Sequence, residues 1–364
     1  MGESLFLSTT PGLEVVLLAE AQPLGSAKLV PGGVKLGGPD GLHRRANLEL
    51  RTASRVMIEL GELKVRDPAD LRRALGGLDL RPYVRRGEAV ELELVARGGM
   101  GERGLREGAL GIAPAAGVPA TAAAPRPLGP LVRLRSERGA VWVSVDTSGE
   151  LLYRRGYRQE VSHAPLRETL AAGLLALSEH TPDVPLWDPL CGSGTLLIEA
   201  ALHAKQHAPG LARSFAFERF PAHDKNAFAR EKAAAFARER PLATPLFGSD
   251  LNAGALGTAR RNARRAGVEG ELRLTRHDAS LPFPGVPAGT LALANFPYGK
   301  RLLDKEALPT LYAAIAKGLR RSGVARLGAL VADERAGEWL SLREPRVHAL
   351  DNGGLSCWLL VGGL

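Results

Sequence analysis

Residues 184–201 read Val-Pro-Leu-Trp-Asp-Pro-Leu-Cys-Gly-Ser-Gly-Thr-Leu-Leu-Ile-Glu-Ala-Ala, with Asp188 directly after a short apolar run. The pattern predicts a buried strand, a glycine turn and a helix with an apolar face, which indicates an α/β fold. The turn lacks the third glycine of the dinucleotide fingerprint, and no Lys-Ser/Thr pair follows it as in a Walker loop. The motif therefore matches neither of these two nucleotide-binding loops.

The same turn is typical of an S-adenosylmethionine site. Gly192 and Gly194 would let backbone amides approach a ligand where a side chain would block it. Asp188, at the end of the strand, would face the methionine ammonium. A tight turn without any ligand is the alternative. The predicted cofactor-binding residues of this stretch are Asp188, Pro189, Cys191, Gly192, Ser193, Gly194 and Thr195.

Two further acids follow strand-like stretches in the order that a doubly wound fold requires. Asp250 ends the stretch 247–250 and is expected to accept hydrogen bonds from ribose hydroxyls. Asp278 follows the stretch 272–275 and is expected to accept from an adenine amino group. Each acid alone could equally be a helix cap or a turn residue. Because ligands of open α/β sheets bind at the carboxyl ends of the strands, the acids and Asn295 together predict one cofactor site.

The tetrapeptide Asn295-Phe296-Pro297-Tyr298 follows an apolar run, 291–294, that predicts another buried strand. A carboxamide oxygen and a neighbouring main-chain carbonyl can accept both hydrogens of an exocyclic base amine, which makes its nitrogen more nucleophilic. Pro297 would aim that carbonyl, and Tyr298 would offer its ring face to an extruded base. Asn295 cannot act as a general base, because a carboxamide has no useful basicity. A strand end closed by a proline turn is the alternative.

The composition favours a polyanionic partner. The 364 residues carry a net charge of +9, and residues 151–364 hold 28 Lys and Arg against 21 Asp and Glu. Such an excess suits phosphate contacts, although drift toward Arg in a GC-rich genome is the alternative. Cys191 and Cys357 are too few for a disulfide framework or a zinc site, and no metal is expected. The chain lacks a long apolar run and a signal-like start, so we expect a cytoplasmic protein.

The N-terminal half predicts a mixed arrangement of helices and strands. Asp67 and Pro68 are a typical N-cap and first-turn pair. The Ala- and Pro-rich stretch 112–130 indicates a linker. An insertion at 205–245 is expected to pack on the outer helices of the C-terminal domain, and covering the cofactor or contacting RNA are the alternatives. The expected elements are strands at 4–8 and 89–95, helices at 13–20, 46–60 and 67–75, and a hairpin formed by 131–135 and 140–145.

Several stretches resemble one known family. Residues 152–158 (Leu-Tyr-Arg-Arg-Gly-Tyr-Arg), 164–172, 188–201 and 295–301 closely resemble the THUMP-domain RNA methyltransferases. The likeness is closest to the bacterial large-subunit rRNA guanine-N2 methyltransferases, whose members are often labelled N6-adenine-specific DNA methylases. The resemblance implies a Rossmann-like class I methyltransferase domain preceded by a smaller α+β region. The expected domains are a ferredoxin-like part at 1–60, a THUMP-like RNA-binding part with a linker at 61–150 and the methyltransferase domain at 151–364.

Two departures from the family pattern concern its catalytic and RNA-binding parts. The family usually has Pro where this chain has Phe296, which blurs whether guanine or adenine is the target. Because that position would supply only a main-chain carbonyl, we expect Phe296→Pro to be tolerated. The Gly-, Ala- and Pro-rich stretch 98–130 replaces a longer THUMP segment, so the RNA-binding part is expected to be shortened.

The motifs and the resemblance together predict an S-adenosylmethionine-dependent RNA methyltransferase. The resemblance implies guanine N2 in 23S rRNA as its target, with tRNA as the other candidate substrate. The predicted RNA-contacting residues are Arg154, Arg155, Lys300 and Arg301, although the first two would alternatively position the segment over the cofactor. A monomer is the default. Two rival functions stay open: an N6-adenine methyltransferase acting on DNA or RNA, and a non-catalytic RNA-binding factor in ribosome assembly.

Overall fold

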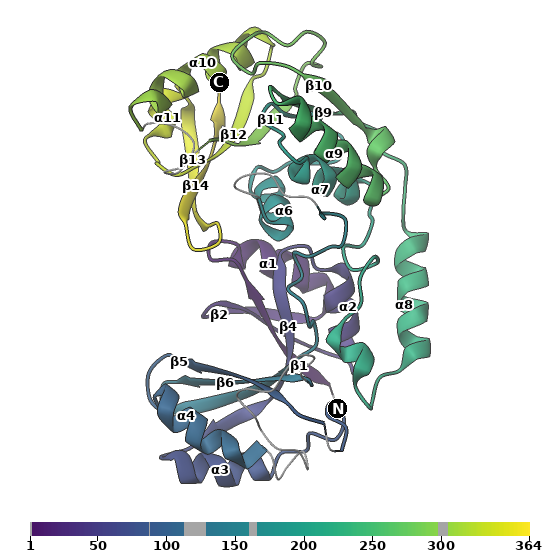
Figure 1. Ribbon diagram of the computed structural model, residues 1–364, viewed down its shortest axis with the longest axis vertical. Helices are drawn as coiled ribbons and strands as arrows, with labels where there is room; N and C mark the ends of the chain where they lie inside the picture. The colour runs from purple at the N-terminus through teal and green to yellow at the C-terminus, as the bar shows by residue number, and fades with distance from the viewer. Residues whose placement is uncertain (1, 87, 113–128, 160–165, 298–304) are drawn as a thin grey trace. The chain divides into compact units, whose positions relative to one another are not determined.

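The computed structural model describes residues 2–86, 88–112, 129–159, 166–297 and 305–364 (Figure 1). The chain forms two compact units, and each unit is built from separated segments. Unit 1 contains Met1–Thr9, Leu18–Leu152 and Arg213–Ala233, and unit 2 contains Thr10–Leu17, Tyr153–Ala212 and Ala234–Leu364. Among the described residues, no helix is long and apolar enough to cross a lipid bilayer.

The described part of unit 1 holds a seven-stranded sheet with the order β2-β3-β1-β4-β7-β6-β5. Neighbouring strands are antiparallel, except that β5 and β6 run parallel. The strands are β1 (Glu3–Thr9), β2 (Ser26–Val30), β3 (Gly33–Gly38), β4 (Ala53–Lys64), β5 (Glu91–Ala96), β6 (Leu131–Glu137) and β7 (Ala140–Asp146). The helices before β6 are α1 (Glu14–Ala21), η1 (Gln22–Leu24), α2 (Leu42–Glu49), α3 (Pro68–Gly76), α4 (Glu102–Gly108) and η2 (Ala109–Gly111).

Most of the elements expected in this half are confirmed. Strand β1, helix α1, strand β5 and the hairpin of β6 with β7 lie within a few residues of their predicted positions. Helix α3 begins as predicted, because the Asp67 side chain accepts a hydrogen bond from the Asp70 N–H and Pro68 occupies the first turn. Of the expected linker, residues 113–128 lie outside the described residues.

The helix expected at 46–60 is wrong over most of its length. Helix α2 ends at Glu49, and β4 begins at Ala53 and pairs with β1 on one side and β7 on the other. The Glu20 carboxylate accepts hydrogen bonds from the Arg51 and Thr52 N–H groups and so fixes the turn between them. Pairing on both edges and burial of 56–58 (Val-Met-Ile) outweigh the helix-like spacing of the sequence.

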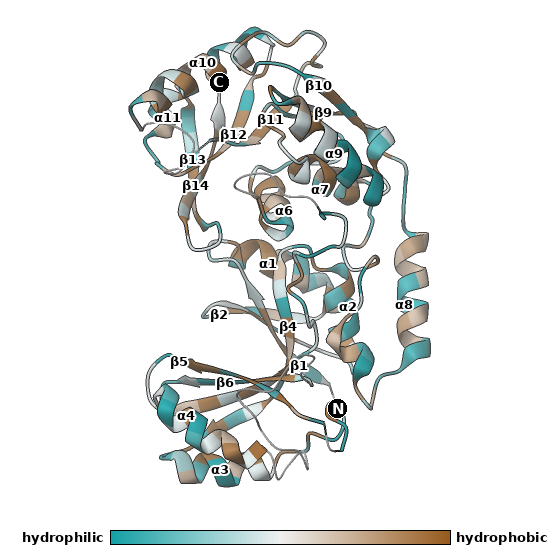
Figure 2. Cartoon of the chain, in the orientation of Figure 1, coloured by the Kyte–Doolittle hydropathy of each residue, from teal (hydrophilic) through white to brown (hydrophobic). Residues whose placement is uncertain are grey.

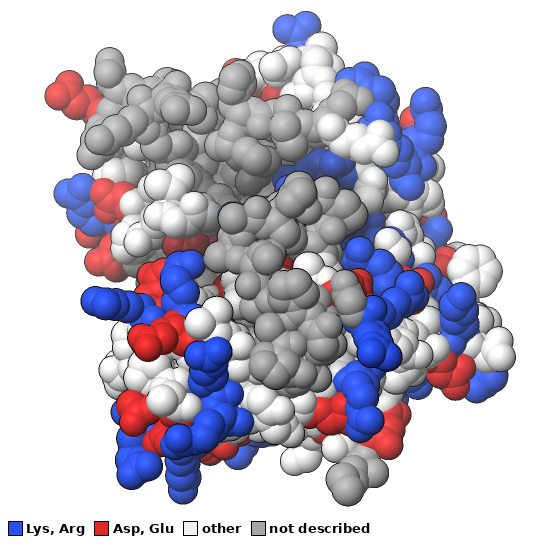
Figure 3. Space-filling model, turned by 60° about the horizontal axis from the view of Figure 1, so that its bottom comes forward, with Lys and Arg blue, Asp and Glu red and all other residues white. Residues whose placement is uncertain are grey.

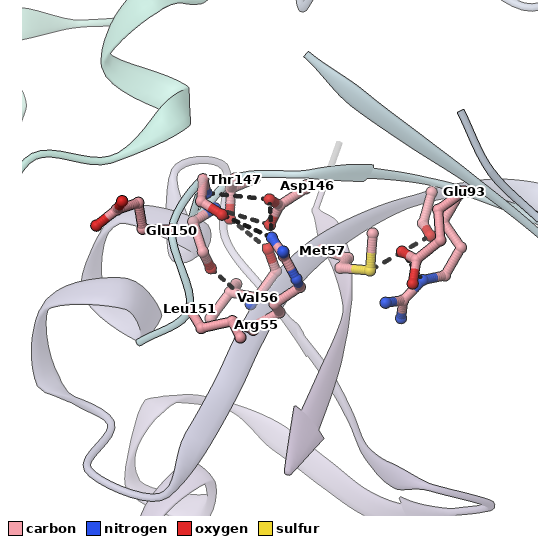
Figure 4. Close-up of polar contacts among 12 residues, drawn as sticks. Arg55, Val56, Met57, Glu93, Asp146, Thr147, Glu150 and Leu151 are labelled. Carbon is pink, nitrogen blue, oxygen red and sulfur yellow. Dashed lines mark hydrogen bonds and ion pairs between the residues drawn. The ribbon is translucent and has the colours of Figure 1, made fainter. Parts of the chain in front are cut away.

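A polar cluster joins the end of β7 to β4 (Figure 4). The Arg55 guanidinium donates to the buried Asp146 carboxylate and to the Gly149 carbonyl, 2.7 Å away. Thr147 Oγ1 donates to the Val56 carbonyl. These bonds hold the turn that follows β7 against the central strand of the sheet.

The inserted segment 213–233 packs in unit 1. The N–H groups of Ala216 and Phe217 donate to the carbonyls of Ser148 and Thr147, and the Arg213 guanidinium donates to the Glu150 carbonyl. The expectation that this insertion packs on the outer helices of the C-terminal domain is therefore wrong for 213–233. The segment contains η3 (Ala216–Arg219) and most of α8 (Lys225–Ala237), whose last four residues belong to unit 2.

The described part of unit 2 holds a second seven-stranded sheet, with the order β10-β9-β8-β11-β12-β14-β13. The first five strands are parallel, and β14 runs antiparallel to both of its neighbours, β12 and β13. The strands are β8 (Leu186–Asp188), β9 (Leu246–Asp250), β10 (Leu272–Arg276), β11 (Leu291–Asn295), β12 (Arg326–Val331), β13 (Arg343–Asp351) and β14 (Ser356–Gly363). Its helices are α6 (Glu168–Leu177), α7 (Thr195–Ala204), α9 (Ala253–Arg265), η4 (Glu269–Glu271), η5 (Lys305–Ala307), α10 (Leu308–Arg321) and α11 (Ala336–Trp339).

This sheet confirms the predicted Rossmann-like domain. The chain moves outward from β8 to β10 and then returns to the other side of β8 with β11, so the strand order reverses between β8 and β11. Leu291 and Leu293 of β11 pack in the core beneath α6 and α7, whereas Ala292, Ala294 and Phe296 pack on the α10 side. Asn295 is the last residue of β11 and so lies at its carboxyl end, and Figure 2 shows the hydropathy of this strand and its neighbours.

Candidate active site

A cavity of about 520 Å³ lies at the carboxyl ends of β8, β9, β10 and β11. Its size is within the range of small-molecule sites, and it lies where the strand order reverses. Most of the residues that the sequence singled out therefore come together. The predicted residues that line it are Asp188, Pro189, Cys191, Gly192, Ser193, Thr195, Asp250, Asp278, Asn295, Phe296 and Pro297.

The glycine turn is held in a tight conformation between β8 and β9. Gly192 and Gly194 both have positive φ, and a Cβ on Gly194 would lie 3.0 Å from the Ala259 Cβ. The Asp250 carboxylate accepts from the Gly192 N–H at 3.0 Å, so the acid at the end of β9 also fixes the turn. Gly194 is the N-cap of α7. Thr195 and Leu196, the first two residues of that helix, line the cavity, so the positive end of the helix lies beside it.

Asp188 is buried, with 4% of its surface exposed, and the Leu190 N–H donates to its carboxylate at 3.1 Å. Burial raises the pKa of the Asp188 carboxyl to about 8, and the negative charge of Asp250 adds to the rise. A cationic group in the cavity would remove this penalty by favouring the ionised carboxylate. The site therefore fits a ligand that carries an ammonium or sulfonium charge.

The far end of the cavity is formed by residues that follow β9 and β10. Asp278 accepts from the Ser280 N–H and hydroxyl, which lowers the pKa of its carboxyl. Leu251 also lines the cavity and is 59% exposed, an unusual position for a leucine. The sequence reasoning missed Leu251, although a large apolar residue directly after the acid of β9 was a usable signal. An exposed leucine at this mouth would cover the face of a flat ring.

At the end of β11, the side-chain oxygen of Asn295 is buried and has no hydrogen-bond partner among the described residues. Such an atom is costly to bury unless a ligand satisfies it. The main-chain carbonyl of Pro297, two residues after Asn295, already has a partner. The Tyr312 hydroxyl of α10 donates to it at 2.9 Å. Of the predicted residues in and after this tetrapeptide, Tyr298, Lys300 and Arg301 lie outside the described residues.

Phe296 is a core residue, which corrects one expectation. Its side chain is 1% exposed and packs edge-to-face on Tyr312, with ring centroids 5.0 Å apart. Its N–H donates to the Leu330 carbonyl of β12 at 3.0 Å. Proline would lack both the buried ring and the N–H, so the structure contradicts the expectation that Phe296→Pro is tolerated.

The two arginines expected to contact RNA differ in position. Arg154 is exposed, whereas Arg155 is 4% exposed and its guanidinium pairs with the buried Glu199 of α7 at 3.2 Å. The Tyr157 hydroxyl donates to the same carboxylate. Arg155 is thus a core residue that anchors the entry segment to α7, and a direct phosphate contact is wrong for it. Its alternative role, positioning that segment, agrees with this placement.

Comparisons with known proteins agree with the fold. The chain matches the model of the RMKL-like methyltransferase domain over residues 155–359 and that of the RlmL ferredoxin-like domain over 4–57. SMU.472, described as a methyltransferase complexed with SAH, is 26% identical, with a TM-score of 0.86 over 99% of this chain and 98% of that one.

Two further structures are similar over all of this chain. A protein of Listeria monocytogenes str. 4b F2365, named a predicted N6-adenine-specific DNA methylase, is 26% identical over 96% of its own length, with a TM-score of 0.86. TrmN from Thermus thermophilus is 21% identical over 100% of its length, with a TM-score of 0.72, and shares the fold. Because the first family model covers more than half of the residues, this chain belongs to the family with the RMKL-like methyltransferase domain.

Proposed function

We propose that this protein is an S-adenosylmethionine-dependent RNA methyltransferase that modifies the N2 amine of guanine, with 23S rRNA as the substrate. The observation that carries the proposal is the unsatisfied Asn295 oxygen at the edge of a cavity that contains the glycine turn and three carboxylates. The proposal also includes that the protein is a cytoplasmic monomer and that its N-terminal region binds RNA in the manner of a THUMP domain.

The cofactor assignment rests on the chemistry of the lining residues. S-adenosylmethionine supplies an activated methyl group on a sulfonium when it is bound. Asp188 would face its ammonium, Asp250 its ribose hydroxyls and Asp278 its adenine amine, and the exposed face of Leu251 would cover the adenine ring. The similar protein SMU.472 was crystallised with SAH, which supports the same ligand for this site.

The target amine would be held at the end of β11. The Asn295 carboxamide oxygen would accept one hydrogen, and the Phe296 carbonyl would accept the other, since the Pro297 carbonyl is occupied by Tyr312. Holding both hydrogens in this way favours a tetrahedral, nucleophilic nitrogen. The proton released after methyl transfer would pass to solvent, because a carboxamide cannot take it.

RNA as the substrate is supported by charge and by family likeness. The net charge is +9, and on the face shown in Figure 3 Lys and Arg lie in several groups separated by Asp and Glu. The match to the RlmL ferredoxin-like domain over 4–57 adds an N-terminal region found with such enzymes. Guanine N2 in 23S rRNA rests on the sequence resemblance alone.

Adenine N6 is the second candidate target. Phe296 replaces the proline that is usual in the guanine-N2 enzymes, and the similar Listeria protein is named as an N6-adenine-specific DNA methylase. Both targets use the same amine-holding geometry.

Methylation of purified substrates tests these proposals directly. The protein would be incubated with labelled S-adenosylmethionine and unmodified 23S rRNA, tRNA or duplex DNA, and the digested nucleosides would be analysed by mass spectrometry. We expect N2-methylguanosine from 23S rRNA. N6-methyladenine in DNA or RNA would establish the second candidate instead. Tight RNA binding without methyl transfer to any of the substrates would instead support the non-catalytic ribosome-assembly factor.

A further inference from the structure

One edge of unit 2 carries a dense group of exposed arginines. Residues 251–277 contain six Arg, no Lys and, as acids, only Glu269 and Glu271. All six arginines are exposed, and they lie on α9 and on β10, the edge strand next to it (Figures 1 and 2). We call this group the arginine edge; its members are Arg260, Arg261, Arg264, Arg265, Arg273 and Arg276.

Three of these arginines are oriented without being neutralised. The Arg260 guanidinium donates to the Leu274 carbonyl at 3.2 Å, and the Arg276 Nε donates to the Leu251 carbonyl at 3.1 Å. The Arg273 guanidinium lies over the Phe247 ring, 5.5 Å from its centroid. Within the part of the chain that the structure describes, none of the three forms an ion pair with a carboxylate. Each keeps its full charge and further N–H donors for an incoming anion.

Several described arginines elsewhere in unit 2 fall into two groups, those that pair with a carboxylate and those that donate to backbone carbonyls. Arg335 pairs with Asp333, and both Arg326 and Arg346 pair with Glu179. Within the arginine edge itself, Arg264 pairs with Glu269. Arg320 and Arg343 instead donate to backbone carbonyls, as Arg260 and Arg276 do. The arginine edge differs from these single residues because six exposed arginines gather on one helix and the adjoining strand.

The arginine edge also adjoins the cavity. Leu251, whose carbonyl accepts from Arg276, lines the cavity together with Asn252 and Ala255 at the start of α9. Asn295 is at the carboxyl end of β11, three strand spacings from Arg276 at the carboxyl end of β10, which is about 14 Å at about 4.8 Å per spacing. A nucleic acid whose base reached Asn295 could therefore place its neighbouring phosphates at this edge.

We propose that the arginine edge binds the phosphates of the RNA that flank the modified nucleotide. The inference rests on the proposed RNA methyltransferase function and adds to it a second contact surface on the catalytic unit. Guanidinium groups suit this role, because their planar fork matches two phosphate oxygens at once. Contacts of this kind position a strand without reading its sequence and weaken as salt rises.

The test compares two double variants that remove the same charge from the same unit. Arg260→Gln with Arg276→Gln removes two uncompensated guanidiniums, and Arg335→Gln with Arg346→Gln removes two that pair with carboxylates. The affinity of the full chain for a fluorescent 23S rRNA fragment would be measured by anisotropy over a range of salt concentrations. Thermal unfolding and SAH affinity would be measured in parallel.

We expect the first variant to bind RNA roughly tenfold more weakly at low salt and to lose about one to two units of the salt slope. Its SAH affinity and melting temperature should stay unchanged, and the paired-arginine variant should bind RNA almost as the unaltered protein does. Lysine at 260 and 276 keeps the charge and should restore most of the salt slope.

Four outcomes would overturn the inference. Equal RNA affinity of the two double variants would show that only the total charge matters. Tighter binding of the unaltered protein to duplex DNA than to RNA, lost in the first variant, would assign the surface to DNA. If the unaltered protein bound no RNA, the proposed function would fail as well, whereas normal RNA binding by the first variant would refute the arginine edge alone.

Discussion

Asp188 illustrates how a binding residue can destabilise the ligand-free protein. The folded protein keeps a proton on this carboxyl up to a pKa of about 8, whereas the unfolded chain releases it near the ordinary value of 3.8. Between these two values the folded state binds more protons than the unfolded state. Raising the pH over this range therefore removes stability.

Substitution of Asp188 by Asn should reverse this effect. The neutral amide cannot ionise, so the variant should unfold at a temperature higher by at least roughly 2–4 °C at pH 8 and show a flatter dependence on pH between 5 and 8. Glu168, whose pKa is also raised by burial, is present in both proteins and cancels in the difference. Affinity for S-adenosylmethionine should fall. Identical slopes of melting temperature against pH would contradict this account.

Substitution of Asn295 by Ala tests the chemistry itself. The Asn295 side-chain oxygen has no hydrogen-bond partner among the described residues, so removing it breaks no hydrogen bond within them. The variant should therefore keep its fold and nearly the same SAH affinity. Single-turnover methyl transfer should fall at least about a hundredfold, which is typical for loss of one transition-state hydrogen-bond partner. Wild-type turnover of this variant on a verified substrate would reduce the tetrapeptide to an ordinary strand end.

For single residues, the sequence predicted which polar side chains lie at the site better than it predicted which side chains are buried. The order of Asp188, Asp250, Asp278 and Asn295 along the chain was enough to place them at one sheet edge. Arg154 and Arg155 look alike in sequence, yet only the first is exposed. Burial of the second depends on Glu199, 44 residues away, and no local pattern reports such a partner.

Strand β4 shows the same limit for whole elements. Its sequence allows a helix, and the strand arises from pairing with β1 and β7, which lie far away in the chain. By contrast, α3 was predictable because its N-cap and first-turn proline are local signals. Local chemistry thus fixed this helix start, whereas long-range pairing decided the central strand.

The aromatic contact between β11 and α10 leads to a prediction about Phe296. Replacement by Pro removes a buried ring and the N–H that donates to Leu330, so it should lower the free energy of unfolding by about 3–5 kcal/mol or more. Phe296→Leu keeps the N–H and most of the apolar volume and should cost much less. Urea unfolding of both variants measures the difference, and equal stability of the proline variant would contradict the buried placement.

Tyr312 should act as a positioning residue for the same strand end. Tyr312→Phe keeps the ring contact with Phe296 but removes the bond to the Pro297 carbonyl, so the carbonyls that follow Asn295 are less firmly held. We expect a roughly fivefold to tenfold lower kcat, from a bond contributing on the order of 1 kcal/mol, with unchanged KM for RNA and unchanged SAH affinity.

A control for Tyr312 lies at the opposite end of β11. The Thr290 hydroxyl also donates to a proline carbonyl, that of Pro287, and Thr290→Val removes this bond with little change of shape. Both variants should lose similar stability, but only Tyr312→Phe should lose kcat. An equal loss of kcat in the two variants would make the effect of Tyr312 a general loss of stability.

On the scale of the whole molecule, the two units do not correspond to two continuous halves of the sequence. Residues 10–17 belong to unit 2, where Leu13 packs in the core against Gly173, and residues 213–233 belong to unit 1. Composition shifts and linkers suggest boundaries along the chain. They cannot report such exchanges, because an exchanged segment is recognised only by what it contacts.

The exchanged segments predict the behaviour of a shortened protein. A chain of residues 153–364 would lack Leu13, whose loss from the core costs about 2–5 kcal/mol, as large-to-small core substitutions do. It would also carry the segment 213–233 without the rest of unit 1, leaving the side chains of Phe215, Phe217, Phe220 and Phe228 without their cover. We expect this chain to bind a hydrophobic dye and to aggregate.

Replacement of 213–233 in the shortened chain by a Gly/Ser linker of equal length should remove most of the dye binding. It should not restore the melting temperature, because Leu13 would still be missing. A further variant would carry residues 10–17, which include Leu13, joined ahead of residue 153 by a flexible linker. This addition should recover part of the lost melting temperature. A shortened chain that melted and bound SAH as the full chain does, without dye binding, would show that neither segment matters to the fold of its unit.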